Sequence, residues 1–245
     1  ERGFESINLD LIYGLPSQTP ATFADSLASV VDMRPDRLAV YSYAHVPWVR
    51  GNQKRIDETA LPGRDDKFRL LADAIGTFRG AGYEQIGMDH FALPEDELAQ
   101  ALSQRRLHRN FMGYTVSRAP SMIGLGISAI GDVAGAYVQN QKKLSTYYAD
   151  LDAGRLPAER GCELSDDDRL RRHVITELMC NLYLHIGSVE AEFGIDFSTH
   201  FAQELRELTG PAADGLVVVE PDALEVTSLG QLFVRNLCMP FDRYL

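Results

Sequence analysis

Apolar and polar positions in the first third of the chain predict a strand–helix–strand unit. Residues 7–13, INLDLIY, form an apolar run broken by Asn8 and Asp10, and such a run is typical of a strand buried on both faces of a parallel sheet. After the helix-start residue Thr19, apolar residues recur at helical spacing. The next strand is expected at residues 38–43. Because the connections are short, the two strands should be parallel.

The middle of the chain predicts two more helices around a strand. A helix is expected at about residues 65–79, and a strand at residues 83–88 ends in the polar pair Asp89-His90. An acidic segment, residues 94–97, then opens an amphipathic helix. The predicted buried stripe of the first helix is Phe68, Leu71, Ile75 and Phe78.

The remainder predicts a separate, mostly helical domain. A helix is expected at residues 139–151, and composition shifts near residues 154–161, so we predict domains at 1–155 and 156–245. Ser165 opens a capping-box pattern. The pattern that follows, helix, helix, hairpin and helix, resembles a winged-helix domain. Its further elements are a helix from about Phe197, a hairpin at 215–220 and 224–227, and a last helix at 229–238.

Composition and charge narrow the function classes. The 245 residues carry a net charge of −11 with a pI of about 5.0, which argues against binding nucleic acid or an anionic membrane surface. The chain contains no run of about 18 apolar residues, so no membrane span is expected, and no signal peptide is recognised. Three distant cysteines favour the reducing cytoplasm over a disulfide framework. Cys162, Cys180 and Cys238 suit neither zinc nor a cluster and should pack as small apolar residues.

Several polar residues are candidates for ligand binding. Asp10 lies inside an apolar strand, where it either bonds a backbone amide at the sheet end or faces a ligand's hydroxyl or ammonium group. His45 and Trp48 follow the second strand and are either site residues or packed loop residues. A glycine-spaced run at residues 124–130 allows close backbone approach to a ligand but is a weak dinucleotide motif. A basic cluster, also interpretable as a solvated face, comprises Arg105, Arg106, His108 and Arg109.

Four segments carry a family resemblance. They are INLDLIYGLP from Ile7, YAHVPW from Tyr43, IGMDHFA from Ile86, and LHRNF from Leu107. Together with the glycine run, YVQNQK from Tyr137 and VRNLCM from Val234, they resemble the oxygen-independent coproporphyrinogen III oxidases, which are radical S-adenosylmethionine enzymes of haem synthesis. The resemblance covers essentially all 245 residues.

The resemblance implies a fold and a missing cluster motif. The fold class is α/β: the end of a radical-SAM partial (β/α)6 barrel, with an extension, followed by a mostly helical, winged-helix-like domain. The family's CxxxCxxC motif, which binds a [4Fe-4S] cluster, has no counterpart in this chain. The cluster ligands are therefore expected in a preceding N-terminal part, and the chain alone should be inactive.

The resemblance also implies site residues. The family binds two S-adenosylmethionine molecules, and the matching positions here are Asp10, Ala44 and Ile130, with Met112 where the family usually has glutamine. Methionine cannot supply the hydrogen bonds of an amide.

The implied reaction is the oxidative decarboxylation of two propionates of coproporphyrinogen III to vinyl groups. Arginine binds carboxylates bidentately, so Arg109, His108, Arg105 and Arg106 are candidates to hold the tetrapyrrole. The implied complete protein is a cytoplasmic monomer that passes electrons to an unidentified acceptor. The alternative, favoured by Met112, is a haem- or tetrapyrrole-binding paralogue without oxidase activity.

Overall fold

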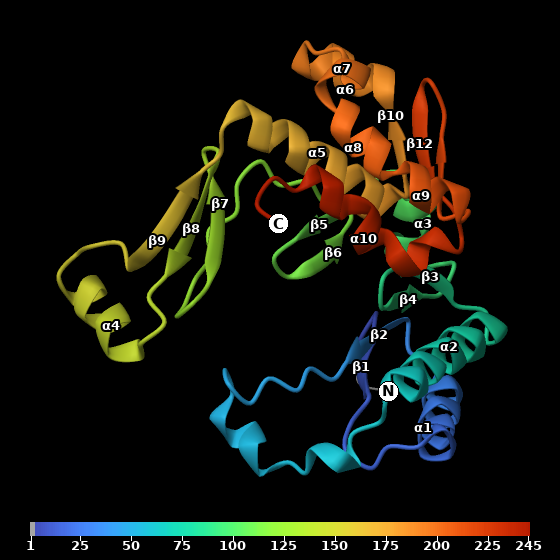
Figure 1. The fold of residues 1–245 in the computed structure, drawn as a ribbon. Coiled ribbons are helices and arrows are strands. Elements are labelled where there is room, and N and C mark those ends of the chain that lie inside the picture. Colours follow the sequence, from blue (N-terminus) through green and yellow to red (C-terminus); the bar gives the residue numbers. More distant parts are fainter. Residues whose placement is uncertain (1–2) are drawn as a thin grey trace. The chain divides into compact units, whose positions relative to one another are not determined.

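The computed structural model describes residues 3–245, which form two compact units that meet in sequence at Gln104 and Arg105 (Figure 1). The first unit contains a four-stranded sheet in the order β1-β2-β4-β3. Its elements are β1 (Asn8–Tyr13), α1 (Pro20–Met33), β2 (Arg37–Ser42), the short 3-10 helices η1 (Gly51–Arg55) and η2 (Glu58–Ala60), α2 (Arg64–Gly80), β3 (Glu84–Gly87), β4 (His90–Ala92) and α3 (Glu97–Ser103). Strands β1 and β2 are parallel, as predicted, whereas β4 runs antiparallel to both β2 and β3.

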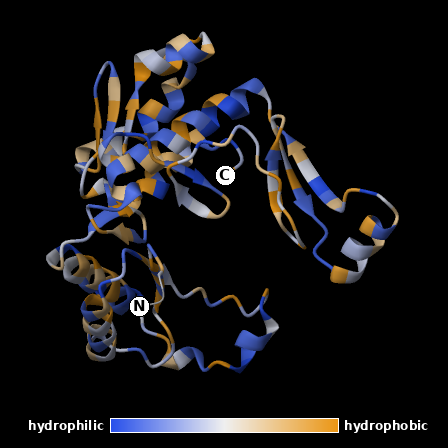
Figure 2. Cartoon of the chain, turned by 180° about the vertical axis from the view of Figure 1, so that it is seen from behind, coloured by the Kyte–Doolittle hydropathy of each residue, from blue (hydrophilic) through white to orange (hydrophobic). Residues whose placement is uncertain are grey.

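Helices α1 and α2 cover one face of this sheet. Both helices carry apolar and polar residues along their length in Figure 2, as expected for helices with one buried face. Leu38 and Val40 of β2 are buried against them, and Leu9 and Leu11 of β1 pack against the same cluster. The first unit therefore has its core between this sheet face and the two helices.

Two sequence predictions in this unit are wrong in detail. Strand β1 is not buried on both faces, because α1 and α2 cover one face and the alternating side chains of Asn8, Asp10 and Ile12 stay exposed on the other. In α2 the buried residues are Leu70, Ala74 and Phe78, and the predicted stripe residue Phe68 is 58% exposed. The true stripe follows a strict i, i+4 spacing, on which an alanine serves as a core residue.

The second unit contains three small sheets around the long helix α5. The sheets are β5-β6, β7-β8-β9 and β10-β12-β11. Its elements are β5 (His108–Asn110), β6 (Gly113–Thr115), β7 (Ile130–Val133), β8 (Ala136–Asn140), α4 (Leu144–Asp152), β9 (Ala158–Glu163), α5 (Asp166–Asn181), β10 (Tyr183–His185), α6 (Ile186–Phe193), α7 (Phe197–His200), α8 (Ala202–Glu207), α9 (Thr209–Ala213), β11 (Val217–Val219), β12 (Ala223–Val226), η3 (Gly230–Phe233), α10 (Val234–Cys238) and η4 (Met239–Phe241).

Local signals in this unit predict some elements and miss others. The capping box at Ser165 is confirmed, since its side chain and that of Asp168 each accept from the other's backbone N–H. The hairpin of β11 and β12 is also confirmed. The expected helix at residues 139–151 begins only at Leu144, because the preceding residues pair with β7 and β9 as strand β8. The expected helix from Phe197 is divided into α7, α8 and α9, and α6 was not predicted.

The compact units do not follow the predicted domain boundary after residue 155. Residues 105–155 contact the C-terminal region: Arg172 of α5 forms an ion pair with Asp132 of β7, and the Leu164 N–H donates to the Gly135 carbonyl at 2.9 Å. The compact unit therefore begins at Arg105. The domain boundary after residue 155, which rests on the change in composition, stays a prediction.

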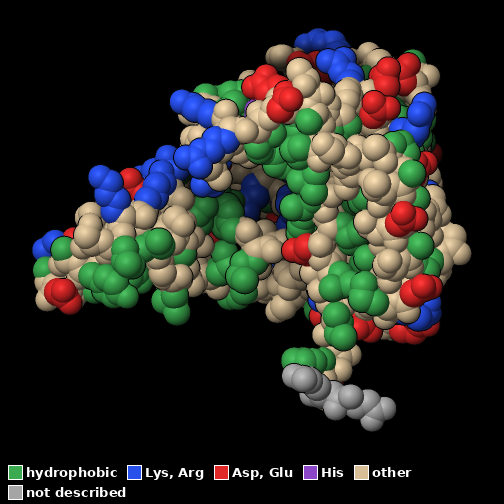
Figure 3. Space-filling model, turned by 90° about the horizontal axis from the view of Figure 1, so that it is seen from below, with side chains coloured by type: hydrophobic (Ala, Val, Ile, Leu, Met, Phe, Trp, Pro, Cys, Tyr) green, Lys and Arg blue, Asp and Glu red, His purple; other side chains and the backbone are tan. Residues whose placement is uncertain are grey.

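Apolar side chains also gather on the surface of the second unit. Figure 3 shows them on the part formed by β7–β9 and α4, where Leu125 and Leu156 are almost fully exposed. Neighbouring exposed residues of the same kind are Leu144, Tyr148 and Leu151. No helix among residues 3–245 is both long and apolar enough to cross a membrane.

Gly230 offers a test of the packing between the hairpin and η3. A methyl group built there would lie 1.8 Å from the Leu216 carbonyl oxygen, so backbone would have to move. We expect Gly230→Ala to lower the free energy of unfolding by about 3 kcal/mol in denaturant titrations. The control is Gly210→Ala in α9, where nothing lies within 4 Å and the change should be neutral or stabilising. Equal stabilities for the two variants would contradict this packing.

Candidate functional site

Asp10 lies on the exposed face of β1, opposite the helices. Its Oδ1 accepts a hydrogen bond from Asn8 Nδ2 at 2.8 Å. Because the carboxylate is exposed, it loses no hydration energy and needs no structural partner. The sequence argument for a ligand at Asp10, which assumed a buried carboxylate, therefore does not hold. An exposed carboxylate on an open sheet face can still accept hydrogen bonds from a ligand's hydroxyl or ammonium group.

Ala44 follows β2 in a loop that Gln53 holds. The Gln53 amide donates from Nε2 to the Ala44 carbonyl at 3.0 Å and accepts at Oε1 from the Val46 N–H at 2.6 Å. His45 Nε2 lies 3.3 Å from Glu58 Oε1, whereas Trp48 is 78% exposed. The loop thus presents Ala44 at the carboxyl end of a strand, where ligands bind in α/β sheets.

Two arginines of the basic cluster lie over different aromatic rings. The Arg105 guanidinium stacks over the Tyr183 ring, 3.5 Å from its centre, whereas that of Arg109 lies 5.5 Å from the ring centre of Tyr114 on the paired strand. His108 and Arg109 are consecutive residues of β5, so their side chains point to opposite faces. Arg105 and Arg109 therefore have different aromatic partners, Tyr183 and Tyr114.

Burial and positive neighbours reduce the charge on His108. Burial is the largest cause that lowers its pKa below 6.5, and the charges of Arg118 and Arg106 lower it further, while Glu177 opposes them. The folded protein holds this proton less tightly than the unfolded chain does. This contribution to stability is intact above pH 6.5 and is lost as pH falls through the lowered pKa. His108 is thus a weaker carboxylate ligand near neutral pH than Arg109.

The glycines of the run at residues 124–130 are explained by backbone of the same chain that passes close to them. A methyl group at Gly124 would lie 2.9 Å from the Ile130 carbonyl, and Gly126 has a φ of +95°. Asn140 Nδ2 donates to the carbonyls of both glycines at 2.9 Å, and the Gly126 N–H donates to the Tyr147 hydroxyl at 3.2 Å. Side chains contributed by distant positions hold the loop, so no local pattern could have identified them.

Met112 and Ile130 both belong to the second unit. Met112 is 91% exposed in the turn between β5 and β6, where Asn110 Oδ1 accepts its N–H. Ile130 is half-buried at the start of β7. Asp10 and Ala44 belong to the first unit, so each pair of predicted cofactor-binding residues is placed within its own unit.

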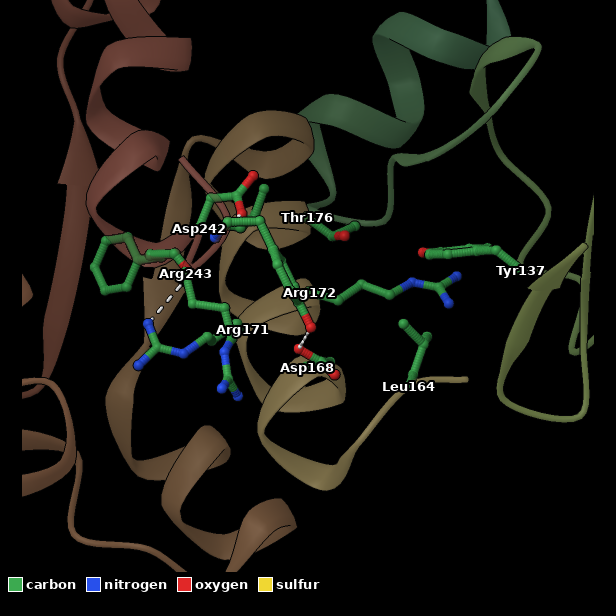
Figure 4. A pocket seen from close by; sticks show the side chains of 11 residues that line it. Tyr137, Leu164, Asp168, Arg171, Arg172, Thr176, Asp242 and Arg243 are labelled. Atoms are coloured by element: carbon green, nitrogen blue, oxygen red, sulfur yellow. Dashed lines mark hydrogen bonds between the residues drawn. The ribbon is translucent and has the colours of Figure 1, made fainter. Parts of the chain in front are cut away.

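A cavity of about 250 Å³ beside α5 was not predicted from sequence (Figure 4). Its arginines have carboxylate partners: Arg171 pairs with Asp167 and Glu204 at 2.9 and 2.8 Å, and Arg243 pairs with Asp167 at 3.0 Å. These ion pairs fix the C-terminal segment against α5. The arginines that line the cavity are therefore engaged in ion pairs within the second unit.

The cysteines do not fit an iron–sulfur cluster. Cys162 is exposed on β9, contrary to the expectation that all three cysteines pack as apolar residues. Burial raises the pKa of the Cys180 and Cys238 thiols to about 12, so neither supplies a thiolate readily. No group of metal-binding side chains is assembled within residues 3–245.

Comparisons with known proteins agree on one class. A family model for the HemN C-terminal domain matches residues 164–233. A solved structure, "Coproporphyrinogen III oxidase (HemN) from Escherichia coli is a Radical SAM enzyme", matches with a TM-score of 0.97 and 44% identity, over 99% of this chain and 56% of that chain. The fold is thus that of the C-terminal part of a radical SAM protein, as the sequence predicted.

Curated relatives identify the family. Proteins named oxygen-independent coproporphyrinogen III oxidase from Salmonella typhimurium and Pseudomonas aeruginosa are 45% and 46% identical over 99% of this chain, which spans 53% of each. The relative from Thermostichus vulcanus is 46% identical, and the chain covers 75% of it. The chain belongs to the family of oxygen-independent coproporphyrinogen III oxidases. It spans about half the length of the first two relatives.

Thiol chemistry tests the environments of the cysteines. Iodoacetamide at pH 8 should alkylate Cys162 at least tenfold faster than Cys180 or Cys238, because only Cys162 is exposed and the other two have a pKa of about 12. Peptide mass spectrometry after timed quenching measures the three rates. In the control Cys162→Ser, rapid labelling should vanish. Rapid labelling of either buried thiol in the folded protein would show that these environments are wrong.

Proposed function

We propose that this chain forms the C-terminal part of an enzyme that oxidatively decarboxylates two propionates of coproporphyrinogen III, giving the two vinyl groups of protoporphyrinogen IX without oxygen. The main support is 44–46% identity to proteins of this name over 99% of the chain, together with the TM-score of 0.97. The names of these relatives favour the oxidase over the alternative of a tetrapyrrole-binding paralogue without oxidase activity.

The proposed cofactor is S-adenosylmethionine, bound as two molecules near Asp10, Ala44, Met112 and Ile130. When bound with the cluster, it supplies the radical that removes hydrogen from a propionate side chain. The exposed Asp10 carboxylate suits the ribose hydroxyls or the ammonium group of this cofactor, and the Ala44 loop offers backbone and apolar contact. Met112 offers only apolar contact, which departs from the usual glutamine.

The tetrapyrrole would bind through its carboxylates. Arg109 offers a guanidinium fork, with its orientation supported by the Tyr114 ring. Arg105, Arg106 and His108 are further proposed contacts, although the close stacking of Arg105 on Tyr183 and the lowered pKa of His108 make Arg109 the main one. The proposal includes an electron acceptor yet to be identified, a monomeric complete protein and a cytoplasmic location.

Removal of the Asp10 carboxylate tests cofactor binding. In the full-length gene product, Asp10→Ala should weaken S-adenosylmethionine binding at least tenfold by calorimetry, because a charged hydrogen bond is lost. The control Asp32→Ala removes an exposed carboxylate from α1 and should leave the Kd unchanged. An unchanged Kd in Asp10→Ala, with the fold intact by circular dichroism, would remove Asp10 from the site.

Replacement of Arg109 tests substrate binding. Arg109→Leu should raise the KM for coproporphyrinogen III by about tenfold, and Arg109→Lys should recover part of this loss because it keeps the charge without the fork. Arg155→Leu, which removes an exposed arginine beyond α4, is the control. If Arg109→Leu lowers only the melting temperature and leaves KM at its wild-type value, the residue is structural.

A further inference from the structure

A second cavity of the second unit, of about 240 Å³, is lined by residues of α5 and β10. His173 and Glu177 are four residues apart on α5, so they share one face of that helix. Tyr183 and His185 are two residues apart on β10 and share one face of that strand. The His173 ring packs edge to face on Phe193, with centres 5.4 Å apart, and forms a fixed wall.

Arg105 lines this cavity with a guanidinium group that keeps its hydrogen-bond donors. The group covers the Tyr183 ring, 3.5 Å from the ring centre. Stacking of this kind uses the flat face of the guanidinium, and its N–H groups lie in the plane of the group. Within residues 3–245 these N–H groups have neither a hydrogen-bond partner nor a carboxylate partner. The ring therefore orients a planar fork that can bind a carboxylate bidentately.

The hydrogen bonds of His185 determine which of its ring nitrogens donates. The Ser188 backbone N–H donates to His185 Nδ1 at 3.0 Å, and the Ser188 hydroxyl lies 2.9 Å from the same nitrogen. Because a backbone N–H can only donate, Nδ1 is an acceptor, and the ring proton is on Nε2. The His185 side chain is exposed at the cavity, and Nε2 has no partner in the described part of the chain. The ring therefore offers one N–H donor to a ligand.

Glu177 adds a negative charge to the cavity wall. Asn181 holds it in place: Asn181 Nδ2 donates to Glu177 Oε2 at 2.8 Å, and Asn181 Oδ1 accepts from the Leu107 N–H at 3.0 Å. This bridge joins α5 to the segment that leads from Arg105 into β5. An anion in the cavity would be attracted by Arg105 and repelled by Glu177. Removal of the Glu177 charge should therefore strengthen the binding of an anion here, which gives the cavity a measurable signature.

We propose that this cavity binds a carboxylate, which accepts hydrogen bonds from the Arg105 guanidinium and from His185 Nε2. A volume of about 240 Å³ suits an acid group on a short chain rather than a whole tetrapyrrole. The carboxylate belongs either to a propionate of the tetrapyrrole, in which case the inference rests on the proposed function, or to a small free carboxylic acid. The cavity lining includes none of the predicted cofactor contacts, so a propionate bound here is one that is held while another reacts.

The first experiment measures the binding of coproporphyrin III and of sodium propionate to the full-length gene product by calorimetry. Arg105→Leu should raise the Kd of the probe that uses the cavity by about tenfold, and Arg105→Lys should recover part of this loss. A rise for coproporphyrin III assigns the carboxylate to the tetrapyrrole, and a rise for propionate alone assigns it to a free acid. Arg206→Leu, at an exposed arginine of α8 outside the cavity, should change neither Kd. A wild type that binds neither probe, or an Arg105→Leu variant that binds both normally, overturns the proposal.

The second experiment uses two variants that keep the local hydrogen bonds. His185→Asn retains an N-cap acceptor for the Ser188 N–H but lacks the ring donor, so the Kd of the same probe should rise about threefold. Glu177→Gln keeps an acceptor for Asn181 without the charge, so the Kd should fall about threefold. A purely structural role does not predict tighter binding, and the gain should vanish when Arg105→Leu is added. Weaker or unchanged binding in Glu177→Gln, with the fold intact by circular dichroism, contradicts the proposal.

These binding measurements do not depend on turnover. A gene product without oxidase activity would refute the proposed function, and the opposite effects of Arg105→Leu and Glu177→Gln on the Kd would still establish the carboxylate pocket. Conversely, an active enzyme in which Arg105→Leu, His185→Asn and Glu177→Gln all bind both probes as wild type does would keep the proposed function and refute this inference.

Discussion

The parallel ladder between β1 and β2 is the constraint on which the proposed site depends. Side chains alternate across a strand, so the register that packs Leu9 and Leu38 against α1 and α2 also assigns Asp10 and Ala39 to the other face. A slip by one residue would exchange these sets. Burial on the helix side therefore determines which polar groups lie on the other face of the sheet, where the proposed cofactor would bind.

The second unit depends on charge pairing around α5. Asp167 accepts from Arg171, Arg243 and His200, and these contacts join the C-terminal segment and α7 to one helix face. Partial burial destabilises an ionised carboxylate less when it has several cationic partners than when it has one. Burial raises the pKa of Asp167, but hydrogen bonds and charges of its partners outweigh burial, and the pKa is lowered. This network gives Arg171 and Arg243 carboxylate partners within the chain itself.

Local signals predicted local structure well. Thr19 and Ser165 both act as helix caps with reciprocal side-chain bonds, because capping involves residues only three positions apart. The β7–β8–β9 sheet escaped prediction because its strands are short, carry no long apolar run and are stabilised by pairing with one another. The same limit applies to Asn140, because its hydrogen bonds to the Gly124 and Gly126 carbonyls form only once that sheet has folded.

The candidate site residues divide in the same way: sequence motifs identified positions, and the folded structure was needed for their contacts and exposure. Motif resemblance identified Asp10, Ala44 and Arg109 as positions of interest, whereas the contacts of Arg105 with Tyr183 and of Arg109 with Tyr114 exist only in the folded chain. Exposure also corrected the physical argument for Asp10, whose carboxylate is accessible, and for Cys162, which no periodic pattern marked as a surface residue. The positions of Asp10 and His90 on either side of Ala39 follow from strand order, which no sequence pattern predicted.

The most direct test of the central claim is an anaerobic turnover measurement on the full-length gene product after cluster reconstitution. The protein is incubated with coproporphyrinogen III, S-adenosylmethionine and a reductant, and the tetrapyrrole products are resolved by mass. The Salmonella typhimurium relative, assayed in parallel, shows that the conditions support the reaction. Our account predicts loss of carbon dioxide from both propionates and formation of protoporphyrinogen IX, dependent on S-adenosylmethionine. Tight tetrapyrrole binding without decarboxylation, under conditions in which the relative turns over, would contradict it.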